Sequence, residues 1–117
     1  MWTKTIERGP YRATILEEQT MGTLERFHRV IAPGGLAHDE DPAIFGFNCM
    51  RALVAVGVIS WERLDESAPE IDWPSLDGEA ALERRMEAVQ GIPTKLVKTI
   101  SDAVNASMEL EDKEAGN

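Results

Sequence analysis

The sequence predicts a mainly α protein of the α+β class, in which an N-terminal β-hairpin packs on a bundle of about four helices around a buried central helix. Three observations lead to this fold class. The apolar residues of 41–61 extend around most of a helical circumference, as in a helix surrounded by other elements. Two β-like runs precede this segment, and two amphipathic segments follow it.

The length of the chain sets the number of domains. At 117 residues with 43% hydrophobic content, it can form one domain with a modest core but not two. We therefore expect a single helical domain over residues 1–110 that includes the hairpin at 1–17. The charged or small residues 111–117 are expected to form a disordered acidic tail.

The hairpin is expected from residues 2–7 and 11–17, which are rich in strand-forming side chains and are separated by the turn signal Gly9-Pro10. A hairpin alone is marginal in water, so helices or a partner sheet must cover its apolar face. The open edges of the hairpin are either shielded by charged side chains or available to a strand of another chain. A homo-oligomer is compatible with the sequence.

The first helix is expected to start after Thr20, whose hydroxyl can cap its N-terminus, and to end near Ala32. Apolar side chains and one histidine recur in it at spacings of three and four. The predicted inward stripe consists of Met21, Leu24, Phe27, His28 and Ile31.

The central helix is expected to begin with Asp41 as its cap and Pro42 at its first position. The β-branched residues near its end also fit a short buried strand, but its length and the Asp-Pro start favour a helix to Trp61. Gly46 and Gly57 weaken this helix by up to about 1 kcal/mol each relative to alanine, which is tolerable where neighbours pack closely. Polar interruptions argue against a membrane span, which needs about 20 mostly apolar residues.

The segment 62–76 is acidic, and its apolar residues follow no sustained helical or strand period. We expect it to form a long irregular connection. Connections of this length are usually functional or mobile. We expect Trp61, Ile71 and Trp73 to pin it onto the core. If Trp61 or Trp73 proves exposed, that side chain is the first candidate anchor for a partner protein.

Two helices are expected to close the chain. The third should run from a cap at Asp77 to a stop at Gly91. Its predicted buried stripe is Ala81, Leu82, Met86 and Val89. The fourth should follow Pro93 and cover 94–110, with an apolar side of Leu96, Val97, Ile100, Ala103, Val104, Ser107 and Met108. Ser101, Asp102, Asn105 and Glu109 are predicted to face water.

The charge distribution excludes some classes of partner. The formal net charge is −9, and residues 61–117 carry fourteen of the 21 acidic side chains. We therefore expect no nucleic acid and no anionic membrane as the main partner, because both require clustered Lys and Arg. Cys49 is the only cysteine, which precludes an intrachain disulfide and suits a reducing cytosol. The N-terminus has no features of a secretory signal, so we expect a cytoplasmic protein.

No catalytic constellation is apparent in the sequence. It has no nucleophile-elbow pattern, no phosphate-binding loop and no CxxC, HExxH or calcium-loop spacing. The run His38-Asp39-Glu40-Asp41 holds four candidate metal ligands, but consecutive loop positions seldom converge on one ion. We predict a protein that is not an enzyme and that uses no cofactor and no metal.

Three stretches carry a resemblance to a known family: 5–7 with 13–15, Ile59-Ser60-Trp61, and 92–100, which reads IPTKLVKTI. With the order of expected elements, they make the chain similar to the tail assembly chaperones of long-tailed (siphovirus-like) bacteriophages. The resemblance implies a small helical chaperone in the host cytoplasm. It implies that the chain binds and solubilises the tape measure protein and assists tail tube assembly, with the tail tube protein as a second partner.

A chaperone of this kind needs an accessible apolar groove for its client. The groove is expected at the segment 61–76, which contains two tryptophans, and at the last helix. The candidate partner-binding residues are Trp61, Ile71, Trp73, Leu96, Ile100 and Val104. The alternative is that these residues only complete the core. Two other functions stay open: a structural head-to-tail connector or tail component, and a small cytosolic protein-binding adaptor or regulator.

Overall fold

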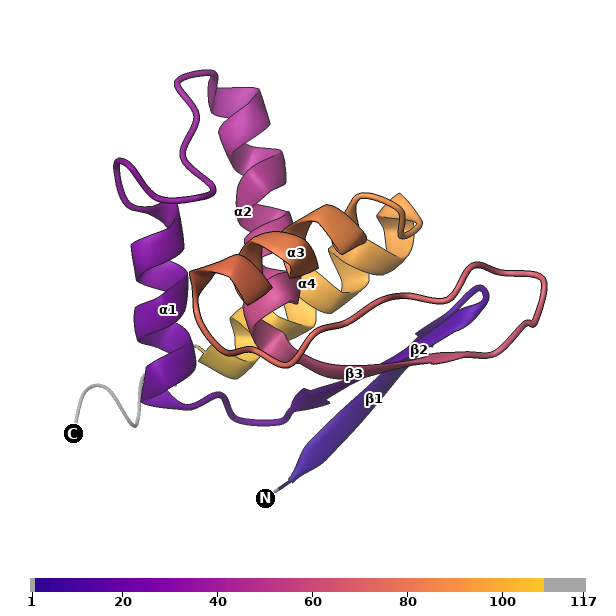
Figure 1. The fold of residues 1–117 in the computed structure, drawn as a ribbon. Coiled ribbons are helices and arrows are strands. Elements are labelled where there is room, and N and C mark those ends of the chain that lie inside the picture. The colour runs from indigo at the N-terminus through magenta and orange to yellow at the C-terminus, as the bar shows by residue number, and fades with distance from the viewer. Residues whose placement is uncertain (1, 109–117) are drawn as a thin grey trace.

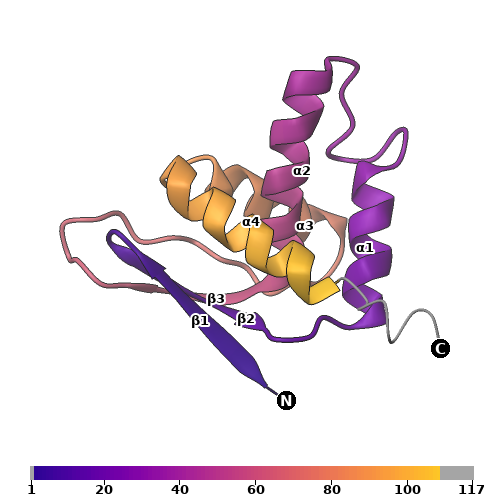
Figure 2. The same cartoon turned by 180° about the vertical axis from the view of Figure 1, so that it is seen from behind.

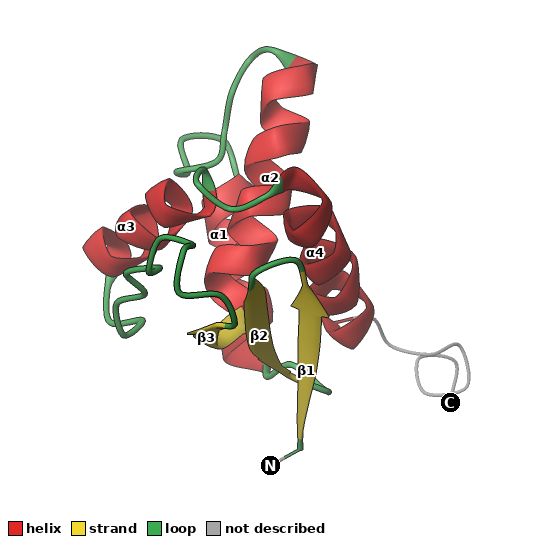
Figure 3. Cartoon of the chain, turned by 90° about the vertical axis from the view of Figure 1, so that its right-hand side faces the viewer, coloured by secondary structure: helices red, strands yellow, loops and turns green. Residues whose placement is uncertain are grey.

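The computed structural model describes residues 2–108, which form a three-stranded sheet with helices gathered on one side of it (Figures 1 and 3). In chain order the elements are β1 (Thr3–Arg8), β2 (Tyr11–Leu16), α1 (Met21–Ile31), α2 (Pro42–Gly57), β3 (Val58–Arg63), α3 (Glu79–Val89) and α4 (Thr94–Met108). This architecture confirms the predicted α+β fold class. The predicted tail at 111–117 lies outside the described residues.

The predicted hairpin is present. β1 pairs with β2 in antiparallel register from Thr3 opposite Leu16 to Arg8 opposite Tyr11. Gly9 in the connecting turn has φ 62°, a conformation that only glycine adopts readily. Exposed charged residues at positions 4, 7 and 8 line β1, the edge strand, which favours the shielded alternative for this edge.

The prediction that the central helix continues to Trp61 is wrong beyond Gly57. Val58 takes an extended conformation and begins β3, which pairs antiparallel with β2 and brings Trp61 opposite Ala13. β-branched residues fit an extended chain well, and this pairing supplies hydrogen bonds to the second edge of β2. The strand alternative therefore holds for Val58–Arg63, and the expected hairpin is part of a three-stranded sheet in the order β1-β2-β3.

α2 is the central helix, because it contacts α1, α3 and α4 (Figure 2). Its start is as predicted: the Asp41 carboxylate accepts hydrogen bonds from the amides of Ala43 and Ile44, at 2.9 and 3.4 Å. Near its end, a Cβ on Gly57 would lie 2.4 Å from Cγ1 of Val104 in α4. The close packing expected at the glycines is thus confirmed at this position.

The prediction that the whole central helix is buried is wrong. Apart from Asn48, its buried residues lie in the second half, at 52 and 54–57, and those at 52 and 54–56 belong to the two clusters of core residues. The first turns extend beyond α3 and α4 (Figure 1). There Ile44 is 43% exposed and Phe47 is 62% exposed, because no described element reaches far enough to cover them.

The predicted inward stripe of α1 is confirmed only in part, because Phe27 and Ile31 are partly buried against the core. Thr23 and Val30 are its buried residues, whereas Met21 is 71% exposed and His28 is also exposed. Only α2 packs extensively against this helix, so a narrow strip is covered rather than the full predicted stripe. The predicted cap at Thr20 is confirmed, since its hydroxyl accepts a hydrogen bond from the amide of Thr23 at 3.3 Å.

Two details of the last helices also differ from the predictions. α3 begins after Gly78, which has φ 87° and no capping side chain, so Asp77 is not the cap. Ser101 was expected in water but is 2% exposed, and its hydroxyl donates to the carbonyl of Lys98 at 3.0 Å. Satisfying the hydroxyl within the helix allows α4 to bury this small side chain.

The two glycines of α2 provide a matched test of this packing. We expect Gly57→Ala to lower the free energy of unfolding by about 1–3 kcal/mol, because the new methyl group overlaps Val104. Gly46→Ala should raise it by up to about 1 kcal/mol, because a Cβ there meets nothing within 4 Å. Urea denaturation followed by circular dichroism measures both, and equal effects at the two positions would contradict the close α2–α4 contact.

Candidate functional site

Arg85 of α3 is a buried cation that the sequence did not single out. It is 5% exposed, and its guanidinium donates to the carbonyls of Pro74, Ala55 and Val58 at 2.8, 2.9 and 3.0 Å. Among the described residues no carboxylate forms a salt bridge with it. Burial, with a smaller contribution from the charge of Arg26, lowers the pKa of Arg85 to about 10, so the side chain stays protonated at neutral pH.

Arg85 and Trp73 together hold the long loop between β3 and α3. Trp73 donates from its indole nitrogen to the carbonyl of Val58 at 3.1 Å, and the Arg85 guanidinium lies 4.7 Å from its ring centroid. Trp61 packs edge-on against Trp73 with 5.6 Å between ring centroids. Trp61, Ile71 and Trp73 are all partly buried against the core, which confirms the prediction that they pin this loop.

An open pocket of about 550 Å³ lies beside these aromatic side chains, and we call it the aromatic pocket. Its lining is Tyr11, Trp61, Arg63, Glu70, Ile71, Asp72 and Trp73, so it brings together three of the predicted partner-binding residues. The charged groups of the lining are paired, Arg63 with Glu70 at 3.7 Å and Asp72 with Arg84 at 3.0 Å. The hydroxyl of Tyr11 donates to the carbonyl of Pro69 at 2.5 Å. The pocket therefore has much of its polar chemistry committed to holding the loop.

The other three predicted residues do not form a binding surface. Leu96, Ile100 and Val104 are at most 1% exposed, so the prediction that they contact a partner is wrong for this structure. α4 contacts α2 as well as β1 and β2, and its apolar side is covered by them. The alternative that these residues complete the core is the one that holds.

The largest exposed apolar side chains of α2 border a second hollow, of about 350 Å³, which we call the α2 groove. It lies between the first half of α2 and the corner where α3 leads into α4. Its lining is mostly apolar and consists of Ile44, Phe47, Asn48, Met50, Arg51, Val89, Gln90, Ile92, Thr94 and Val97. The buried side chains of Val89, Ile92 and Val97 form its base, and exposed Ile44 and Phe47 its rim.

The α2 groove contains one cation, Arg51. Its Nη2 donates to the side-chain oxygen of Asn48, whose own amide nitrogen donates to the carbonyl of Ala37 at 3.0 Å. Asn48 is 8% exposed, so the group that positions Arg51 is itself fixed. Within residues 2–108, Arg51 forms no salt bridge and its buried Nε has no hydrogen-bond partner.

This arrangement is suited to binding an apolar surface. In the described part of the chain, no three His, Cys, Asp or Glu side chains are placed to hold a metal ion. Burial raises the pKa of the Cys49 thiol, which disfavours the reactive thiolate. None of the described helices combines the length and apolarity that a membrane crossing requires.

Comparisons with protein-family models, with curated proteins and with solved structures found no match to this chain.

Adjacent arginines of α3 test the role of the buried guanidinium. We expect Arg85→Met to lower the free energy of unfolding by about 1–3 kcal/mol, because it leaves buried carbonyls without donors. Arg84→Met should change it by no more than about 0.5 kcal/mol, because the Arg84–Asp72 pair is exposed. Urea denaturation monitored by circular dichroism compares the two, and a neutral Arg85→Met would refute the structural role.

Proposed function

We propose that this chain is a non-enzymatic tail assembly chaperone of a long-tailed bacteriophage. In this proposal it acts in the host cytoplasm, binds and solubilises the tape measure protein, and assists assembly of the tail tube. The observation that carries the proposal is the α2 groove, where Ile44 and Phe47 are exposed beside a mostly apolar lining. The resemblance of 5–7 with 13–15, 59–61 and 92–100 to this family supplies the identity of the client.

The walls of the groove support a helical client. They consist of side chains from α2 and from the ends of α3 and α4 that meet at 90–94, so the groove presents no open strand edge. A bound segment must therefore satisfy its own backbone hydrogen bonds, which an α-helix does. An amphipathic helix can then bury its apolar stripe against Phe47 and Ile44.

The charge of the chain supports the solubilising part of the proposal. The net charge is −9, with most of the acidic excess in residues 61–117, whereas the groove itself is lined by one basic and no acidic side chain. Like charge keeps protein complexes apart and soluble. A complex with an apolar client would retain this acidic surface.

Co-expression tests the proposal. The proposal expects a very long, helix-rich reading frame directly after this gene, and the product of such a frame is the client candidate. We expect co-expression with the wild-type chain to raise its soluble fraction and to allow its recovery by pull-down. Ile44→Asp with Phe47→Asp should weaken binding at least about tenfold, because both apolar contacts are lost.

Ile59→Asp is the matched control. Ile59 is 47% exposed, close to the 43% of Ile44, but it lies on β3 outside the groove. It should leave the soluble fraction of the client unchanged. A client that is no more soluble with the wild-type chain, or that is lost equally with the control, would contradict the proposal. Stoichiometric presence of the chain in finished phage particles would instead support a connector or tail component.

A further inference from the structure

Arg51 lies on the same side of α2 as the two exposed apolar residues of the groove. Ile44, Phe47 and Arg51 are spaced by three and four positions, so they follow one another along one face of the helix. The seven positions from Ile44 to Arg51 correspond to about 10 Å along the helix axis. The groove thus presents two apolar contacts followed, one turn later, by a cation.

The cation is prepared for an anionic partner. Its position is set by the hydrogen bond to Asn48, which is buried and tied to the backbone at Ala37. A guanidinium that is held in place loses less conformational entropy when it binds a carboxylate. Since no described carboxylate pairs with Arg51 in this acidic chain, its charge remains available.

We propose that the α2 groove selects amphipathic helices that carry an acidic residue one turn away from a pair of apolar residues spaced by three. The apolar pair contacts Ile44 and Phe47, and the carboxylate accepts hydrogen bonds from the guanidinium of Arg51. A helix antiparallel to α2 would need the pattern acid-x3-apolar-x2-apolar, and a parallel helix would need its reverse. This inference applies to any helix that enters the groove. It rests on the proposed function only where it identifies the client as the tape measure protein.

The selectivity follows from desolvation. A helix without a carboxylate at this point would enclose the Arg51 guanidinium in an apolar interface without a counter-charge, which is costly. A charge-assisted hydrogen bond in the same place is stronger than a neutral one. The long-range field of a chain of charge −9 repels an acidic helix, so the preference must come from this local contact.

Two helical peptides of about 20 residues test the inference, identical except for Glu or Gln at the acidic position. In isothermal titration calorimetry, the wild-type chain should bind the Glu peptide with a Kd about tenfold lower than its Kd for the Gln peptide, or lower still. Arg51→Met should remove the difference between the peptides, and Arg51→Glu should favour a third peptide with Lys at that position. Arg8→Met, which removes an exposed arginine on β1, is the control and should leave the preference intact.

Each outcome decides the inference. Equal affinity of the wild-type chain for the Glu and Gln peptides, or no binding of either, would overturn it. An unchanged preference in Arg51→Met would overturn it as well, and circular dichroism of each variant checks that the fold is retained. The tape measure candidate separates this inference from the proposed function. If the chain solubilises the candidate regardless of Arg51, only the inference fails. If the peptides are discriminated but the candidate is not solubilised, only the identity of the client fails.

Discussion

The abrupt passage from α2 into β3 is the constraint on which the rest of the structure depends. Gly57 ends the helix and Val58 begins the strand with no connecting loop, so carbonyls at this end have no room to turn toward water. The guanidinium of Arg85 meets the carbonyls of Ala55 and Val58, at the negative end of the helix dipole. Within residues 2–108, the buried charge is thereby compensated without a carboxylate. Because Arg85 also binds the carbonyl of Pro74, one side chain fixes the helix end, the strand start and the loop.

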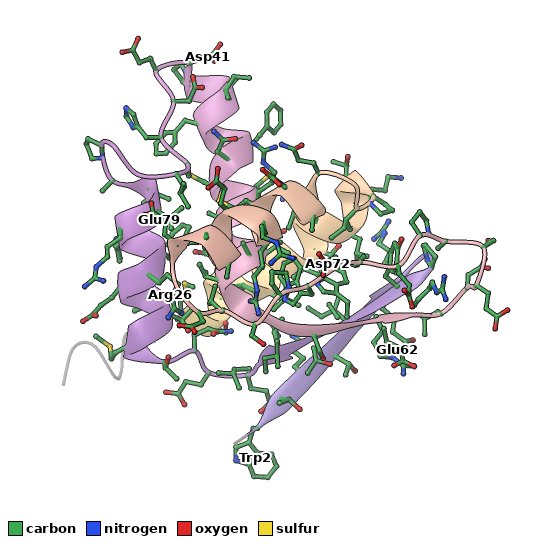
Figure 4. The ribbon with its side chains drawn as sticks, viewed as in Figure 1. Trp2, Arg26, Asp41, Glu62, Asp72 and Glu79 are labelled. Carbon is green, nitrogen blue, oxygen red and sulfur yellow. The ribbon has the colours of Figure 1, made fainter. Side chains whose placement is uncertain are left out.

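This junction divides α2 into two parts with different roles. Near Gly57 the missing side chain lets α4 approach closely, and the surrounding residues form the core. The opposite end, which begins at the Asp41 cap, extends past the neighbouring helices (Figure 4, where Asp41 is labelled at its tip). Its apolar residues therefore belong to a helix whose other end is buried, while Ile44 and Phe47 remain open to solvent. A helix anchored in this way can present an apolar surface without unfolding.

The helix caps and the hairpin turn could be predicted because they depend on adjacent residues. Which residues are exposed could not be predicted, because exposure depends on how the helices and strands pack together. The caps at Thr20 and Asp41 and the turn at Gly9 depend on adjacent residues only, and they were predicted from the sequence. Val58 and its neighbours fit either a helix or a strand, and only pairing with β2 decides between them. The apolar stripe of α4 was equally compatible with a core and a groove. Which residues remained open depended on how far α3 and α4 extend along α2, and the burial of Arg85 depended on backbone carbonyls that no sequence pattern reveals.

The distribution of indole side chains has an optical consequence. Trp2 is 81% exposed and points away from the body of the protein (Figure 4), whereas Trp61 and Trp73 pack against each other and the core. Because Trp2 is already in water, loss of structure changes its emission little. Any blue shift or quenching of the tryptophan fluorescence in the native state arises at Trp61 of β3 and Trp73 of the loop. The tryptophan fluorescence of this chain therefore reports whether residues 64–78 are docked. It responds little to changes at the surface around Ile44 and Phe47.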